Sequence, residues 1–273
     1  MAKQTGIHGL RGKVNGMSYY GSKVGGSLVR KINEGMSARV KTGKEYANTR
    51  KNNAEFGMCG DFAGAFIKPI TLRWRFLLDS IATGKMVKAM REILTYDGTN
   101  IWGQRDIKSS YHDLLIEKFN SFSKNEMLSE IVGTIGAGVT FDEDGNNLAL
   151  PAKPILSEGS QQELIDAGIN HIQVKYFNLQ ASTPVFSSIA DAYEKSQGSM
   201  VEIPALKVDV DITAAAPVDL ATATSATSNF TPVVDGDSLG GLLVVYLPCR
   251  KVGNAVNVLQ EYCAAYLFKV NPA

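Results

Sequence analysis

The segment INHIQVKYFNLQA, residues 169–181, decides the fold class, because its first half alternates apolar and polar side chains with a period of two. The two alternating sets are Ile172, Val174 and Tyr176 on one side and His171, Gln173 and Lys175 on the other. Such alternation is typical of a strand that buries one face of an antiparallel sheet. We therefore expect this segment to lie in a β-rich part of the chain.

Further short runs of strand-like sequence follow residue 128 and surround this segment. They are IVGTIGAGVTFDEDGNNLAL at 131–150, ALKVDVDITA at 205–214, GLLVVYLPC at 241–249 and CAAYLFKV at 263–270. Short, spaced strands of this kind predict an antiparallel β-sandwich over residues 128–273. Asp144-Gly145 marks a hairpin turn in the first run. Thirteen of the nineteen residues at 213–231 are Ala, Thr or Ser, which predicts a long exposed loop within 213–240.

Residues 46–127 carry apolar side chains at helical spacing instead. Pro69 suits the first turn of a helix, and Gly84 suits the end of that helix. The pattern restarts over 86–94 and again over 111–122. The sequence therefore predicts an α+β protein in which a helical domain at 46–127 precedes the β-sandwich domain.

The opening of the chain has a third character. The stretch GKVNGMSYYGSKVGGSLVRK, residues 12–31, places apolar and aromatic residues on either side of a Gly-rich break, which predicts a two-stranded β-ribbon. Nine glycines occur in the first 45 residues, so we expect a basic, Gly-rich arm at 1–45 that contains this β-hairpin. A lone two-stranded ribbon is marginally stable in water. The arm therefore needs a surface to pack on, which points to assembly.

Charge is distributed unevenly along the chain. Residues 1–51 hold eleven Lys or Arg against two acidic residues, a charge of +9, whereas the remainder holds seventeen basic and twenty-five acidic residues, a charge of −8. The arm could therefore bind nucleic acid or the acidic body of a neighbouring copy, or it could be a solvated tail. We favour interlacing of subunits. The candidate assembly or anion-contacting residues are Arg11, Lys13, Tyr19, Tyr20, Lys23, Arg30, Lys31, Arg39, Lys41 and Lys44.

Little in the sequence suggests catalysis. Three cysteines do not make a disulfide framework, and their sparse use indicates folding in a reducing compartment. Cys59 lies in an Ala-, Gly- and Phe-rich helical stretch, where a buried small hydrophobe is more usual than a nucleophile. We find no phosphate-binding loop, no complete calcium loop after Asp142 and no cluster of metal ligands. The sequence thus predicts a protein that is not an enzyme and holds no cofactor.

Two further expectations concern location. The opening MAKQTGIHGLRG lacks the apolar core of a secretory signal. The longest apolar run, around LLVVYL, falls far short of the ~20 residues that a spanning helix needs. We therefore expect no membrane insertion and synthesis in a cytoplasm.

The opening also resembles a known group of proteins. The Gly12–Val14 strand start, the Tyr19-Tyr20 pair, the Val29–Lys31 strand end and the Thr49–Gly57 helix start are similar to the start of uncharacterised virion-associated proteins of phages and prophages of Bacteroidetes bacteria, including crAss-like phages. The similarity covers roughly the first fifth of the chain. It implies a virion structural protein made in the host bacterial cytoplasm, a ring or connector subunit of the neck or tail or else a capsid component. Its partners would be further copies of itself and other virion proteins, with DNA as an alternative partner of the basic arm. It carries over no active site.

Overall fold

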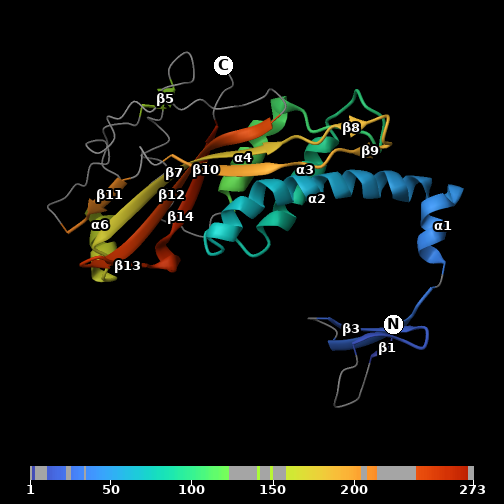
Figure 1. Ribbon diagram of the computed structural model, residues 1–273, viewed down its shortest axis with the longest axis horizontal. Helices are drawn as coiled ribbons and strands as arrows, with labels where there is room; N and C mark the ends of the chain where they lie inside the picture. Colours follow the sequence, from blue (N-terminus) through green and yellow to red (C-terminus); the bar gives the residue numbers. More distant parts are fainter. Residues whose placement is uncertain are drawn as a thin grey trace. The chain divides into compact units, whose positions relative to one another are not determined.

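A computed structural model describes residues 2–3, 11–22, 26–33, 35–122, 140–141, 148–149, 158–203, 208–213 and 238–269. The chain divides into two compact units, Met1–Asn52 and Asn53–Ala273. The helix α2 (Ala47–Arg73) runs through the boundary between them. The predicted mixed α+β class is confirmed, since a small N-terminal sheet is followed by helices and then by a larger antiparallel sheet (Figure 1). The boundaries predicted at 45/46 and 127/128 stay predictions.

The first unit is built on a four-stranded antiparallel sheet in the order β1-β4-β3-β2. Its elements are β1 (Ala2–Lys3), β2 (Gly12–Val14), β3 (Met17–Ser22) and β4 (Gly26–Lys31), followed by α1 (Met36–Thr42) and the 3₁₀ turn η1 (Lys44–Tyr46). The predicted hairpin is confirmed in the pairing of β3 with β4.

The sequence interpretation of this sheet missed one turn. Asn15 and Gly16 have φ angles of 48° and 71°, so the chain reverses between β2 and β3 instead of continuing as one strand. Two consecutive residues at positive φ are the mark of a type I′ hairpin turn, for which Asn-Gly is the preferred pair. The Asn15-Gly16 dipeptide was therefore the signal for a third strand.

The second unit begins with a helical layer. It contains the body of α2, then α3 (Ala82–Leu94), the 3₁₀ turn η2 (Ser109–Tyr111) and α4 (His112–Asn120). Two predicted boundaries are wrong, because Pro69 lies inside α2 and Gly84 lies in the first turn of α3. Proline removes one hydrogen bond from a helix, and here the buried residues Phe66 and Ile70 on either side of Pro69 keep α2 packed. Gly84 is exposed, and α3 continues past it because Met86 and Met90 are buried.

The larger sheet has six antiparallel strands. Four lie in the order β10-β7-β12-β13, while β11 also pairs with β7 and β14 with β12. Its elements are β7 (His171–Ser182), β10 (Gly198–Glu202), β11 (Val208–Asp211), β12 (Ser238–Val252), β13 (Ala255–Val258), the 3₁₀ turn η5 (Gln260–Tyr262) and β14 (Ala264–Lys269). All four predicted strand segments after residue 168 therefore contain strands.

Smaller elements complete this unit. A helix that the sequence interpretation did not include, α6 (Glu158–Asp166), precedes β7. Two short antiparallel ribbons pair β5 (Thr140–Phe141) with β6 (Leu148–Ala149), and β8 (Phe186–Ser187) with β9 (Ala192–Tyr193). The predicted Asp144-Gly145 turn and most of the predicted 213–240 loop lie outside the described residues.

A sandwich of two facing sheets is not what the described residues form. One face of the six-stranded sheet packs on the helices, where the Trp74 and Phe177 rings meet at 5.0 Å and Asn120 hydrogen-bonds the backbone of Leu267 (Figure 1). Ile172, Val174 and the neighbouring Tyr176 are buried on the opposite face, as the alternation predicted. The helices take the place of a second sheet on the face that carries Phe177, Leu179 and Ala181, which share one core with the helical side chains. A period of two shows that a face is buried and does not show what covers it.

Candidate functional site

The described side chains of the N-terminal sheet are exposed or half-buried. None of the side chains described in residues 11–52 is buried, and the apolar Val14 is 51% exposed. Small sheets gain stability only when an apolar face is covered by another layer. The sheet is therefore the first candidate for a surface that binds another molecule.

The register of the strands sorts the side chains onto two faces, because directly paired residues point the same way. Val14 pairs with Met17, which in turn pairs with Lys31, and Tyr19 pairs with Val29. One face thus carries three aliphatic side chains and an aromatic ring, with Lys31 beside them. We call this the apolar face of the N-terminal sheet.

The opposite face is basic. Lys13 and Arg30 both pair with Ser18, so all three share this face, and Tyr20 pairs with Leu28 next to them. The Arg30 guanidinium lies over the Tyr20 ring, 5.6 Å from its centroid. A guanidinium on an aromatic face is a stabilising cation–π pair, and the same combination can contact phosphates and bases. We call this the basic face.

The remaining sequence-predicted residues do not gather in one patch. The Arg11 Nη2 atom lies 3.6 Å from the point where a Cβ at Gly21 would stand, so the Arg11 side chain crosses β3. Arg39 lies 3.6 Å from the Glu45 carboxylate, and both side chains are exposed. Lys41 on α1 and Lys44 on η1 are exposed, and Lys23 lies outside the described residues. The structure therefore brings together Lys13, Tyr20 and Arg30 on the basic face, and Tyr19, Lys31 and the Arg11 guanidinium on the apolar face. It leaves Arg39, Lys41 and Lys44 outside the sheet.

Arg50 belongs to the internal structure of this unit. Its Nη1 atom donates hydrogen bonds to the carbonyl oxygens of Val40 (3.0 Å) and Gly43 (2.8 Å), at the end of α1. A basic side chain at this position satisfies carbonyls that have no intrahelical donor. The sequence interpretation counted Arg50 only as part of the arm's positive charge, and no local motif marks its bonding role.

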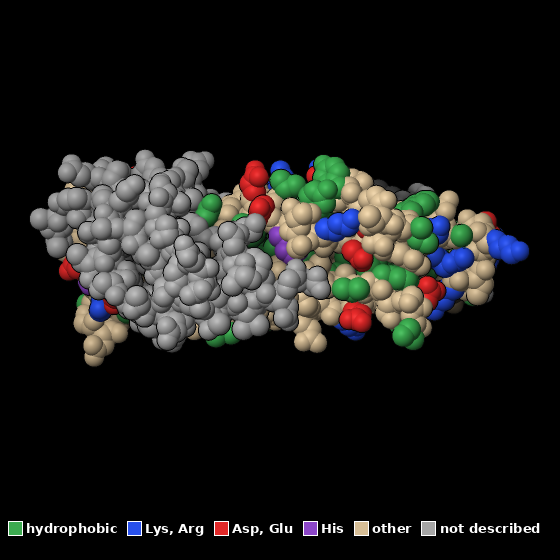
Figure 2. Space-filling model, turned by 90° about the horizontal axis from the view of Figure 1, so that it is seen from above, with side chains coloured by type: hydrophobic (Ala, Val, Ile, Leu, Met, Phe, Trp, Pro, Cys, Tyr) green, Lys and Arg blue, Asp and Glu red, His purple; other side chains and the backbone are tan. Residues whose placement is uncertain are grey.

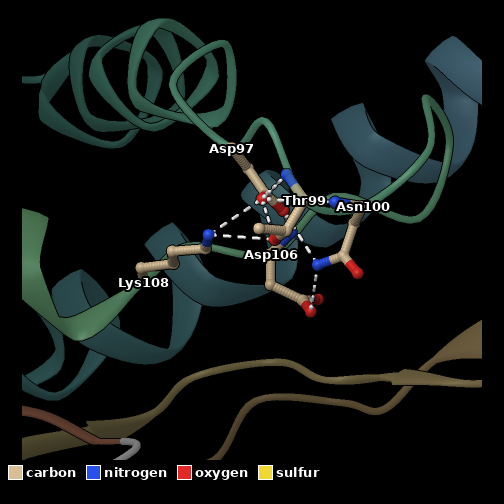
Figure 3. A network of polar contacts seen from close by, with 5 residues as sticks. All are labelled: Asp97, Thr99, Asn100, Asp106 and Lys108. Carbon is tan, nitrogen blue, oxygen red and sulfur yellow. Dashed lines mark hydrogen bonds and ion pairs between the residues drawn. The ribbon is translucent and has the colours of Figure 1, made fainter.

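The second unit holds a densely bonded loop, Thr95–Lys108, between α3 and η2. Asp97 is its centre: the Thr99 hydroxyl donates to Asp97 Oδ1 (2.6 Å), while the Asn100 side-chain amide and the Asp106 backbone N–H donate to Asp97 Oδ2 (2.9 and 3.0 Å) (Figure 3). The Lys108 ammonium lies 3.1 Å from Asp97 Oδ1. The carboxylate is thus surrounded by donors although its side chain is only 1% exposed.

This network separates the acidities of the two carboxyl groups. Burial raises the pKa of Asp97, but the hydrogen bonds from Thr99, Asp106 and Asn100 outweigh burial and hold the pKa well below its ordinary value. Burial, followed by the negative charge of Asp97, raises the pKa of Asp106. The Asn100 amide donates to both carboxylates, but Asp97 receives further hydrogen bonds that Asp106 does not.

Glu55 of α2 binds the loop at a second point. Glu55 of α2 is 2% exposed and accepts hydrogen bonds from Arg105 Nε (2.8 Å), Arg105 Nη2 (2.6 Å) and the Gly103 backbone N–H (2.7 Å). Burial raises the pKa of Glu55, but these bonds outweigh it and the pKa is lowered. A two-pronged Arg–carboxylate pair fixes direction as well as distance. The loop is therefore held rigidly on the helical layer.

The chemistry that these groups support is structural. The Lys108 ammonium lies against the Asp97 carboxylate, and no group of three or more metal-ligating side chains occurs among the described residues. Cys59 is fully buried, and burial raises the pKa of its thiol to about 12, so it stays protonated at neutral pH. Within the described ranges, no helix is both long and apolar enough to cross a membrane.

Comparison of the chain with models of known families, with curated proteins and with solved structures gave no match. The candidate site therefore rests on the residues themselves.

Proposed function

We propose that this chain is a structural subunit of a phage particle, a ring or connector component of the neck or tail, which self-assembles by docking its N-terminal sheet on a neighbouring copy. The proposal rests on one observation: among the side chains that the structure describes in residues 11–52, none is buried. Ordering a backbone costs about 1–2 kcal/mol per residue, and burial of apolar surface is the main term that offsets it. An N-terminal sheet with an open apolar face gains that burial from another molecule.

Charge supports a second copy as that molecule. The first 51 residues carry +9 and the rest of the chain carries −8, so the sheet of one copy and the body of another attract each other. If each copy binds the next in the same way, and a whole number of these rotations completes a full turn, the copies form a closed ring. The resemblance of the opening to virion-associated proteins of crAss-like phages supports the particle as the place of assembly.

Size-exclusion chromatography with light scattering tests the assembly step. We expect the full chain to form a defined oligomer free of nucleic acid, and a variant lacking residues 1–45 to remain folded but monomeric. An oligomer of undiminished size without residues 1–45 would contradict the proposal.

The assignment to the phage particle is tested separately. Virions of a phage that encodes the chain are purified and treated with protease and nuclease, and the chain should remain with them. Loss of the chain from the treated virions would contradict the assignment.

Nucleic-acid binding is the second candidate, and the basic face of the sheet favours it. Lys13, Tyr20 and Arg30 combine cations with an aromatic ring, as surfaces that follow a single-stranded backbone do. This function predicts a monomer that binds DNA with an affinity falling steeply as salt rises.

A capsid-associated role would instead retain the assembly through the N-terminal sheet and change only the position in the particle.

A further inference from the structure

A hydrogen bond joins two segments of the second unit, the loop Thr95–Lys108 and the β8–β9 hairpin. The Tyr193 hydroxyl on β9 donates a hydrogen bond to the Arg105 carbonyl oxygen (2.8 Å). The β8–β9 hairpin is thereby attached to the rigid loop Thr95–Lys108. Figure 1 shows β8 and β9 beside each other at the edge of this unit.

Apolar side chains project from both segments. Ile101 is 65% exposed and Trp102 39% exposed on the loop, while Val185 is 49% and Ile189 99% exposed on the hairpin. We call these four residues the loop–hairpin surface. Figure 2 shows hydrophobic side chains in small groups among charged ones on one face of the molecule. Two adjoining segments that both present large apolar side chains are typical of a binding surface.

The loop–hairpin surface is also held ready for binding. Ile101 and Trp102 lie between residues whose positions are fixed, since Asp97 binds Asn100 and Asp106, and Glu55 binds Gly103 and Arg105. An anchored side chain loses less conformational entropy when a partner covers it. Tryptophan in a partly exposed, rigid position is the residue type most enriched among the strongest contributors to interfaces. The buried polar network thus fixes the backbone on either side of these two side chains.

We propose that the loop–hairpin surface receives the apolar face of a neighbouring copy's N-terminal sheet. This inference rests on the proposed function and names the acceptor site. The two surfaces match in polarity, since Val14, Met17 and Val29 form one and Ile101 and Ile189 belong to the other.

The charges match as well. The hairpin carries the exposed Asp191 and Glu194 against the single exposed Lys195, whereas Lys31 lies on the apolar face of the sheet. An apolar groove between α2 and α3 is the poorer acceptor. It is lined by Phe56 and Val87 together with Lys88, Arg91 and Glu92, so the charges around it are net positive and would repel a basic sheet.

A mixing experiment between two full-chain cysteine variants tests the contact directly. The three native cysteines are all buried, so an exposed introduced cysteine reacts selectively. Val14→Cys mixed with Ile189→Cys under mild oxidation should give a disulfide-linked dimer of one copy of each variant. Val14→Cys mixed with Leu72→Cys is the matched control, because Leu72 is 76% exposed on α2 but outside the loop–hairpin surface. Equal cross-linking in the two mixtures would overturn the acceptor site.

Charged substitutions supply the second measurement. Ile101→Asp and Ile189→Asp should each weaken assembly at least tenfold, and Leu72→Asp should leave it unchanged. Both target side chains are exposed, so the variants should keep the far-UV spectrum of the parent chain. If both assemble like the parent while deletion of residues 1–45 abolishes assembly, the acceptor site is wrong and the proposed function stands. If the deletion itself assembles normally, the proposed function fails first.

Discussion

Gly198 lies so close to Ala65 that a Cβ atom at position 198 would stand 1.8 Å from the Ala65 carbonyl oxygen. Gly198 begins β10, and Ala65 belongs to α2, four residues before Pro69. Proline has no N–H, so Pro69 cannot make the usual helical hydrogen bond to the Ala65 carbonyl. Helix and sheet therefore meet backbone to backbone at the point where the bonding of α2 is interrupted.

Among the glycines whose surroundings the structure describes, Gly198 has the least room for a side chain. We expect Gly198→Ala to lower the free energy of unfolding by about 1–3 kcal/mol, because β10 or α2 must shift to admit the methyl group. Gly57→Ala is the control: nothing lies within 4 Å of a Cβ there, and alanine in a helix interior should stabilise by about 0.5–1 kcal/mol. Denaturant unfolding at one protein concentration measures both. Equal effects of the two substitutions would contradict the close contact.

The Asp97 network predicts a specific dependence on pH. The pKa of Asp97 is lower in the folded chain than its ordinary value of 3.8. The Asp97 carboxylate therefore stabilises the fold at every pH above about 3.8. This stabilisation is lost as the pH falls from there through the folded-state pKa. Asp97→Asn should therefore cost about 2–4 kcal/mol at neutral pH and flatten the loss of stability below about pH 4. Glu261→Gln, at an exposed position, should change neither. Parallel acid-unfolding curves for Asp97→Asn and the parent chain would refute this role.

The sequence predicted the parts of the fold that rest on local pattern. The alternation at residues 172–176 and the helical spacing over 86–94 both correspond to real elements, because a buried face imposes its period on the sequence. Pro69 and Gly84 misled the helix boundaries, since tertiary packing outweighs the preference of a single residue. The Asn15-Gly16 turn was present as a signal and was not used.

The buried polar anchors could not have been predicted in the same way. Glu55 and Arg105 are fifty residues apart, and nothing in the local sequence of either residue indicates that they form a pair. Asp97 sits in a polar loop, where an exposed turn was the natural expectation for a DGTN sequence. The loop–hairpin surface depends on both anchors, so it became visible only from the three-dimensional contacts.

The cysteines provide a prediction on reactivity. Burial raises the pKa of the Cys59 and Cys263 thiols to about 12, and burial also raises the pKa of Cys249, so almost no thiolate is present at pH 8. A disulfide reagent should therefore modify the native chain slowly and take up three equivalents only after denaturation. Cys59→Ala should reduce that number to two and leave assembly intact. One fast equivalent in the native chain that disappears in Cys59→Ala would revive a nucleophilic role for this residue.

The two faces of the N-terminal sheet give the sharpest test of how it is used. Lys31 lies on the apolar face with Met17, whereas Arg30 lies on the basic face over Tyr20. If the apolar face docks on a neighbour, Lys31→Glu should weaken association about tenfold, equivalent to about 1.4 kcal/mol, and Arg30→Glu should have a much smaller effect. The difference should shrink as salt rises, since screening acts over about 8 Å at physiological ionic strength. Light scattering over a range of concentrations measures both variants. The reverse order, with Arg30→Glu the more damaging and DNA binding lost with it, would assign the sheet to nucleic acid instead.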